Sequence, residues 1–194
     1  MTTVPKTTVS ARGVPASESD IVSRPVVRKV LAVARVVIGF TFLWAFVDKL
    51  FGLGFATAPA KAWINGGTPA QGFLKGVDGP FASLLKSFQN PFGDWLFMAA
   101  LLGIGVAMIA GAGVRIAAAA GTLLMLMMFM AEWPAATASV GGKVVQGSTN
   151  PIVDSHWHEA LLLIICAVTL AGDTWGLGTW WAKKSFVKKY SWLR

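Results

Sequence analysis

The chain has 194 residues, of which 55% are hydrophobic and only 13% charged, and its mean hydropathy is +0.61. This composition excludes an ordinary soluble domain and predicts an all-α membrane protein. The formal net charge of +8 is concentrated at the two ends of the chain, where lysines and arginines flank apolar segments. Such flanks favour anionic lipid over nucleic acid as a partner, and the positive-inside rule places the N and C termini in the cytoplasm.

Residues 1–25 are rich in Thr, Ser and Pro and show no apolar period, which predicts a disordered cytoplasmic tail. The first span is expected at residues 26–51, since a rise of about 1.5 Å per residue lets it cross a core of about 30 Å. Its length and its distance from the first residue favour an uncleaved anchor over a signal peptide. A long outer loop follows, and it is expected to carry short interfacial helices at residues 59–64 and 80–88.

Three further apolar segments are expected to span the membrane, at residues 95–112, 116–133 and 156–172. With the first span they would form a four-transmembrane-helix bundle in residues 26–178. The sequence thus predicts a multi-pass protein of the plasma membrane. The first of these contains Gly103, Ala107 and Gly111 at four-residue spacing, which predicts a close approach between helices. Residues 179–194 interleave aromatic side chains with lysines, which is typical of a tail lying on the inner leaflet.

Ionisable residues inside the spans are the first functional candidates, because a charge in lipid is costly. Arg35 and Lys49 lie on roughly one face of the first span, about 20 Å apart. Arg35 is expected in the cytoplasmic half and Lys49 at the outer end. Lys49 is predicted either to extend to lipid headgroups or to bind a polar group such as a quinone carbonyl. Arg35 is predicted to be a buried structural charge or to bind a headgroup, with a polar ligand as the other interpretation. Asp48 is predicted to pair with a basic group or to relay a proton.

The segment from Asp154 to Glu159 contains His156 and His158 and enters the fourth span from the outer side. Histidine changes charge near neutral pH, so this segment suits proton transfer coupled to quinone chemistry, or alternatively only caps the helix. We therefore expect the first and fourth spans to meet at their outer ends, beside Asp48.

No haem, metal or nucleotide is expected as a cofactor. On a helix the two histidines would point to nearly opposite faces, and axial histidines on facing helices are absent. Cys166 is the only cysteine, which excludes a dithiol motif within the chain. No nucleotide-binding glycine motif occurs in a suitable context.

Several short motifs together resemble the DoxX/DoxD family over residues 26–181. They are the Asp48-Lys49-Leu50 exit of the first span, residues 62–67, the histidine of the fourth span, residues 172–176, and the first-span pattern Arg35, Gly39, Phe42 and Lys49. The resemblance implies a four-helix membrane protein. DoxD-like members are the large subunit of thiosulfate:quinone oxidoreductase, which oxidises thiosulfate to tetrathionate and reduces quinone together with a small companion subunit. DoxX members are associated with a sulfurtransferase and superoxide dismutase in oxidant defence.

The leading hypothesis is thus a membrane subunit of a quinone-linked oxidoreductase that acts on a small sulfur anion at the outer face. The residues expected to bind substrate or quinone are Lys49, Arg35, Trp63 and Glu159, and those expected to move protons are His156, His158 and Asp48. The alternative is a non-catalytic scaffold that docks redox enzymes through its basic tails. A transporter is a weaker alternative, since no inverted repeat is evident. The sequence is compatible with a homo-oligomer.

Overall fold

The computed structural model describes residues 17–133, 139–140, 143–144 and 152–194. These residues are helical apart from turns, loops and two paired antiparallel strands of two residues each. The three helices long and apolar enough to cross a membrane are α2 (Pro25–Phe51), α5 (Pro91–Ala110) and α6 (Val114–Ala131), and the shorter apolar helix is α7 (Ser155–Val168). The strands are β1 (Ser139–Val140) and β2 (Lys143–Val144). The helical membrane-protein class predicted from composition is therefore confirmed.

Local sequence explains where the long helices begin and end. Pro25 starts α2, since its fixed φ and missing N–H suit a first helical turn, and Gly52 ends the helix with a φ of 67°. Asn90 caps α5 by accepting a hydrogen bond from the N–H of Gly93, so this helix begins about one turn before the predicted boundary. Residues 111–113 then form a tight turn into α6.

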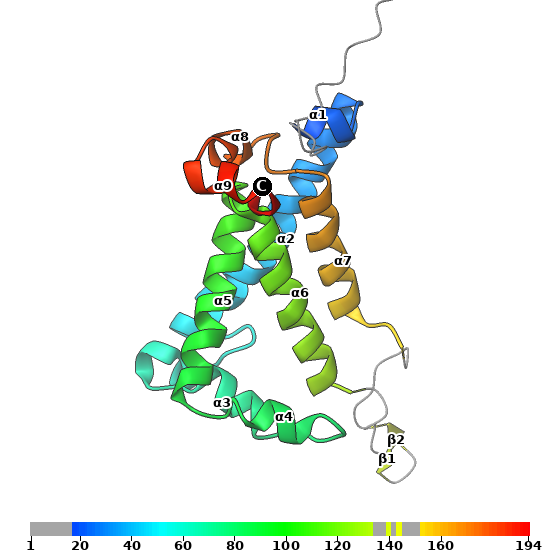
Figure 1. Ribbon diagram of the computed structural model, residues 1–194. Helices are drawn as coiled ribbons and strands as arrows, with labels where there is room; N and C mark the ends of the chain where they lie inside the picture. Colours follow the sequence, from blue (N-terminus) through cyan, green and yellow to red (C-terminus); the bar gives the residue numbers. More distant parts are fainter. Residues whose placement is uncertain (1–16, 134–138, 141–142, 145–151) are drawn as a thin grey trace, which may run out of the picture.

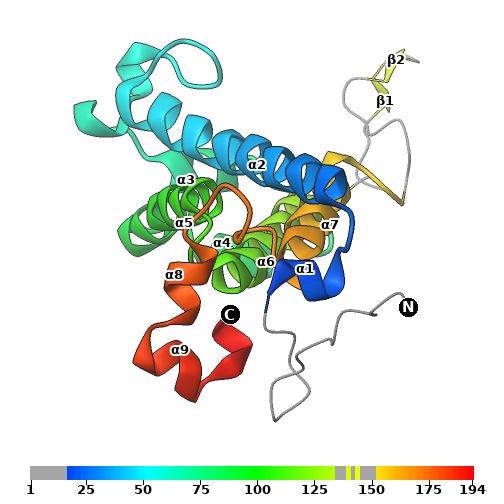
Figure 2. The same ribbon diagram turned by 90° about the horizontal axis from the view of Figure 1, so that it is seen from above.

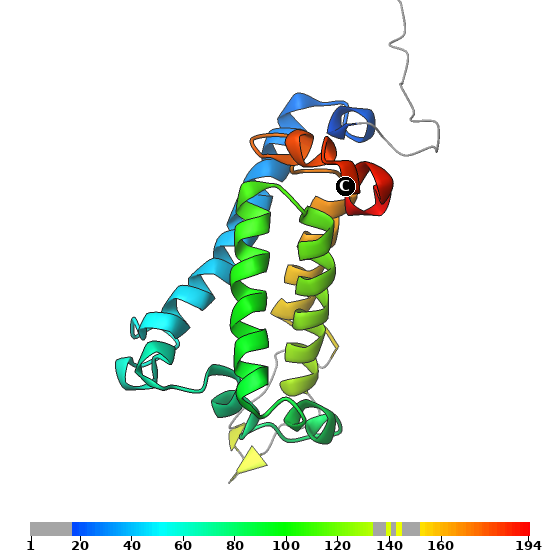
Figure 3. The same cartoon turned by 60° about the vertical axis from the view of Figure 1, so that its left-hand side comes forward.

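The four apolar helices pack as neighbours, with α2 against α5 and α6 against α7. Figure 1 shows α5 and α6 close together at their connecting turn and diverging toward their other ends. In Figure 2, one end of α2 lies beside α7 and the other end lies far from it. We call the end that holds α1, α8 and α9 the Arg35 end, and the end that holds α3 and α4 the Lys49 end; Figure 3 shows both.

The Lys49 end is formed by the long loop between α2 and α5, which carries short helices as expected. Two 3-10 turns and α4 occupy the predicted segments, whereas α3 was not predicted, because its six residues contain both Pro and Gly. Apolar side chains of α3 and α4 pack against α6. The elements are η1 (Pro59–Lys61), η2 (Trp63–Asn65), α3 (Pro69–Leu74) and α4 (Ala82–Lys86).

The Arg35 end contains the short elements α1 (Glu18–Ile21), α8 (Gly178–Ala182), α9 (Ser185–Lys189) and η4 (Ser191–Leu193). The prediction of a disordered tail is wrong for residues 17–25, and residues 1–16 lie outside the described part of the chain. Glu18 is buried, its N–H donates to Asp173, and its carboxylate accepts from the Thr174 hydroxyl. Local composition could not reveal these partners, which lie about 155 residues away.

Close packing between α2 and α5 depends on a glycine that lies outside the predicted four-residue stripe. A Cβ added to Gly105 would lie 2.7 Å from the backbone nitrogen of Leu43, whereas one added to Gly103 would meet nothing within 4 Å. Two residues along a helix correspond to about 200° of rotation, so these glycines face nearly opposite sides. The predicted stripe is therefore wrong at Gly103, and Gly105 makes the close approach instead.

Candidate functional site

A cavity of about 820 Å³ lies at the Lys49 end. It lies among α2, α5, α6 and the short helices of the long loop, and most of its lining is apolar. Its charged lining residues are Lys49 and Lys61, and none of the described residues that line it is Asp or Glu. This volume lies within the range of about 300 to 1,000 Å³ that is usual for small-molecule sites.

Lys49 lies in the last turn of α2, where its half-buried side chain reaches the cavity. Its Nζ lies 5.9 Å from the centroid of the Phe97 ring, and it has no hydrogen bond or ion pair to any residue that the structure describes. An ammonium group among apolar side chains is costly without an acceptor. The geometry therefore suits a ligand that brings an oxygen acceptor to Nζ.

Asp48 precedes Lys49 but has a different environment. Its carboxylate is 1% exposed and accepts the backbone N–H groups of Phe55, at 3.2 Å, and Ala56, at 3.0 Å. These bonds fix the turn that follows α2, and Asp48 is not among the residues that line the cavity. The expected pairing with a basic side chain is replaced by two backbone contacts.

The histidines lie at the start of α7, on the far side of the molecule from the end of α2. Asp154 caps α7 by accepting the N–H of His156 at 3.0 Å, and its second oxygen lies 2.8 Å from His156 Nδ1. His158 is exposed and Glu159 half-buried. Figures 1 and 2 show α2 and α7 approaching at the Arg35 end and separating toward the Lys49 end. The expected meeting of the first and fourth spans beside Asp48 is thus wrong, because α2 crosses the bundle obliquely.

Arg35 is fully buried, and four of its five N–H groups donate to backbone carbonyls. Its Nε donates to Ala171 at 3.1 Å and its Nη2 to Trp175 at 3.0 Å, in the segment after α7. Its Nη1 donates to Met108 and Ile109 in the last turn of α5, at the negative end of the helix dipole. The predicted role in binding quinone or substrate is therefore replaced by a structural one, since little of the guanidinium remains free.

Glycines make room for the Arg35 guanidinium. A Cβ on Gly176 would lie 3.0 Å from Arg35 Nη2, and a Cβ on Gly172 would lie 2.3 Å from the carbonyl oxygen of Gly111. Trp175, between the two, has a positive φ of 51°, which is unusual for a residue with a side chain. The motif at residues 172–176 thus forms a tight backbone loop that, together with Ala171 just before it, presents two carbonyls to Arg35.

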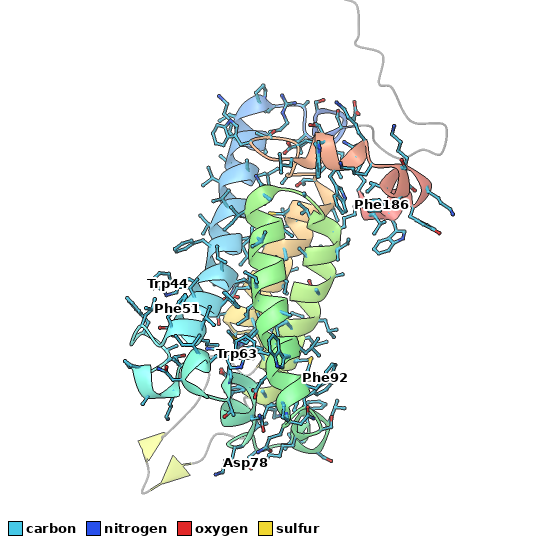
Figure 4. All side chains as sticks on the ribbon, turned by 90° about the vertical axis from the view of Figure 1, so that its left-hand side faces the viewer. Trp44, Phe51, Trp63, Asp78, Phe92 and Phe186 are labelled. Atoms are coloured by element: carbon cyan, nitrogen blue, oxygen red, sulfur yellow. The ribbon has the colours of Figure 1, made fainter. Side chains whose placement is uncertain are left out.

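Trp63 belongs to η2 and packs against α5. Its ring meets the Trp95 ring edge to face, with centroids 4.6 Å apart, and Figure 4 shows it between α2 and α5. The same view shows Trp44 and Phe51 on the outward side of α2. Trp63 does not line the cavity, so the structure gives it the role of anchoring the loop rather than contacting a ligand.

Asp94 is an important residue that the sequence analysis did not assign to the site. It is 4% exposed and accepts the backbone N–H groups of Ala70, at 2.7 Å, and Gln71, at 3.0 Å, as well as the Gln71 side-chain amide. These bonds attach the first turn of α3 to α5, and residues of α3 line the cavity. A carboxylate in the first turn of an apolar helix was the available signal.

The cavity also uses the Met-rich half of α6, through Met127 and Met128. Methionine adapts its shape readily, so this composition was a second signal for a binding surface. Within the described residues, no group of three His, Cys, Asp or Glu side chains is placed to hold a metal ion.

Together these features define a class: a helical membrane protein with an apolar cavity that contains an ammonium group without a hydrogen-bonding partner among the described residues. No family model, curated protein or solved structure matches the chain. The resemblance to the DoxX/DoxD family therefore remains an expectation that depends on the motifs.

Proposed function

We propose that this protein binds a membrane quinone in the cavity at the Lys49 end, as the membrane subunit of a DoxX/DoxD-like oxidoreductase. The observation that carries the proposal is the unpaired Lys49 ammonium inside an apolar cavity of about 820 Å³. A quinone ring is flat and apolar and carries carbonyl oxygens at its edge. Lys49 would donate a hydrogen bond to one carbonyl, while Phe97 and neighbouring apolar side chains would contact the ring.

The proposed topology places the Lys49 end outside and the Arg35 end in the cytoplasm, in the plasma membrane. Lys183, Lys184, Lys188 and Lys189 all lie at the Arg35 end, which supports this orientation by the positive-inside rule. We propose α7 as the fourth span, which returns the C terminus to the cytoplasm. Its 14 residues cover about 21 Å, so the bilayer would thin locally around it.

The electrons would come from thiosulfate or a similar small sulfur anion through a companion subunit. Oxidation of two thiosulfate ions joins their outer sulfurs as tetrathionate and releases two electrons. The bound quinone takes up these two electrons and two protons to become a quinol. His156, His158 and Glu159 lie away from the cavity, so in this proposal they serve the interface with the companion subunit rather than the quinone itself.

A binding measurement on the purified protein tests the proposal. Decylubiquinone is titrated into detergent-solubilised protein, and binding is followed by quenching of tryptophan fluorescence. We expect saturable binding that Lys49→Met weakens about tenfold or more, because a charge-assisted hydrogen bond is lost. Lys75→Met is the matched control, since Lys75 is exposed on the loop and does not line the cavity. Equal affinity in the Lys49→Met variant, or no binding by the wild type, would refute the proposal.

A membrane scaffold is the second candidate, favoured by the basic and aromatic surface of α8 and α9. Trp180 is 50% exposed, with the Lys184 Nζ 3.7 Å from its ring centroid. A scaffold would lose its redox-enzyme partners when the four lysines of residues 183–189 are changed to serine, while quinone would not bind at all. If the variant still binds its partner enzymes and the protein binds quinone, the scaffold function is excluded.

A further inference from the structure

The cavity at the Lys49 end has two rims of different chemistry. One rim is formed by the long loop and includes Lys61 and Thr68, which are both exposed. The other rim is formed by apolar residues of two different helices, Leu96 and Ala100 of α5 and Ala120 and Leu123 of α6. The cavity therefore changes from polar to apolar from one side to the other.

The apolar rim lies where α5 and α6 diverge. The two helices meet at residues 111–113 and separate toward the Lys49 end, as Figure 1 shows. Leu96 is 47% exposed and Leu123 is 59% exposed, although both line the cavity. Because these helices have the composition of membrane spans, a surface between them faces the hydrocarbon of a bilayer.

Apolar side chains of the long loop line the remaining part of the cavity. Leu74 of α3, Leu85 of α4 and Phe88 line it there, and Leu74 and Leu85 are buried. Asp94 holds the first turn of α3 in place. A long apolar chain attached to a group at Lys49 would therefore leave the cavity through the gap between α5 and α6, because the rim there is apolar like the chain.

We infer that the ligand is an amphiphile whose head lies at Lys49 and whose long apolar chain leaves the cavity between α5 and α6 into the bilayer. This inference rests on the proposed function, and for a quinone the chain is its isoprenoid tail. The ligand exchanges laterally with the membrane, and a chain longer than the cavity is accommodated because most of it stays in lipid. The loop rim remains available to small polar reactants.

The test narrows the apolar rim and compares two probes, a tail-less benzoquinone and the same ring with a long isoprenoid tail. Ala120 is exposed and lines the rim, whereas Ala119 is also exposed but does not line the cavity. We expect Ala120→Phe to weaken binding of the tailed probe about tenfold and to change that of the tail-less probe less than about twofold. Ala119→Phe, the matched control, should change neither. Equal effects of Ala120→Phe on both probes, or no effect on either, would overturn the inference.

A photoreactive group at the end of the tail supplies a second readout on the unaltered protein in lipid nanodiscs. Labelling should fall on residues 96–103 and 116–123, and labelling of residues 73–88 would overturn the tail route. If the proposed function is wrong, meaning that Lys49 does not bind the head group, the result differs from both outcomes of the tail experiments. In that case Lys49→Met would bind both probes as tightly as the wild type, while the Ala120→Phe variant would still report separately on the tail.

Discussion

Two cations of the same helix, Arg35 and Lys49, have opposite environments. Arg35 is fully buried, and its guanidinium donates to carbonyls of α5 and of the segment after α7. Lys49 reaches an apolar cavity and has no hydrogen-bonding partner within the described residues. Backbone carbonyls accept from four of the five Arg35 N–H groups, whereas none of the described residues accepts a hydrogen bond from Lys49. The comparison shows that a charge in a membrane helix is not by itself a sign of a ligand site, because the backbone can satisfy it, as it does at Arg35.

The comparison predicts the largest loss of stability at the Arg35 end. Arg35→Leu should lower the free energy of unfolding by about 3 to 5 kcal/mol, because several buried carbonyls lose their donors together. Arg35→Lys should recover little of this loss, since one ammonium group cannot reach carbonyls on two segments. Unfolding of the detergent-solubilised protein by denaturant, followed by tryptophan fluorescence, measures the effect.

Lys49→Leu is the matched variant for that experiment. It removes a cation from the same helix without breaking a hydrogen bond within the described residues, so stability should stay equal or rise. A loss at Lys49 as large as that at Arg35 would contradict the division between a structural and a ligand-binding charge.

The next largest loss of stability is expected at the contact between α2 and α5. This contact holds α2, which carries Arg35 and Lys49, in place. Gly105→Ala should cost about 1 to 3 kcal/mol, since its Cβ would lie 2.7 Å from the backbone of Leu43. Gly103→Ala, two residues away, should be neutral or stabilise the helix by up to about 1 kcal/mol, because its Cβ meets open space. The same unfolding assay applies, and equal effects at the two glycines would contradict the observed packing.

Much of this fold follows from the sequence, but little of the site does. Hydropathy, Pro25, Gly52 and the turn at residues 111–113 define the long helices, because those signals are local. The partners of Arg35 are backbone carbonyls, which no residue type encodes, and they come from segments more than 70 residues away. Sequence patterns therefore identified Arg35 as unusual without showing that its charge is satisfied.

The predicted association of Lys49 with the histidines failed for a related reason. Hydropathy gives the order of the spans and not the angle at which they cross, and α2 separates from α7 toward the Lys49 end. Lys49 lines a cavity, and that cavity depends on α3, which Asp94 attaches to α5. The structure thus retains Lys49 as a candidate and replaces its expected partners.

A smaller effect is expected where α3 closes the cavity at the Lys49 end. Asp94→Asn should weaken the attachment of α3 by about 1 to 2 kcal/mol, since an amide accepts fewer hydrogen bonds than a carboxylate. Cleavage by trypsin after the exposed Lys75 should become faster, and bound quinone should slow it again. Asp78→Asn is the control. The Asp78 side chain is 91% exposed, and its ion pair to Lys86, at 4.0 Å, is a weak surface contact. Unchanged cleavage in Asp94→Asn would argue against this attachment.

The smallest effect is a pH dependence confined to the Arg35 end. Burial raises the pKa of Glu18 above its ordinary value of 4.5, the hydrogen bond from Thr174 lowers it in part, and Asp173 raises it further. The folded state thus holds this proton more tightly than the unfolded state, so the attachment of α1 is strongest below pH 4.5 and weakens as the pH rises through the raised pKa. Hydrogen exchange at residues 18–21, corrected for intrinsic rates, measures this change. Glu18→Gln should remove the dependence, and a slope that persists would exclude Glu18 as its origin.

The most direct test of the central claim is an experimental structure of the protein in lipid with a long-tailed quinone added. We predict density for the ring in the cavity, with a carbonyl oxygen about 2.7 to 3.2 Å from Lys49 Nζ, and density for the tail between α5 and α6. A cavity filled only by protein side chains, or a quinone bound away from Lys49, would contradict the account.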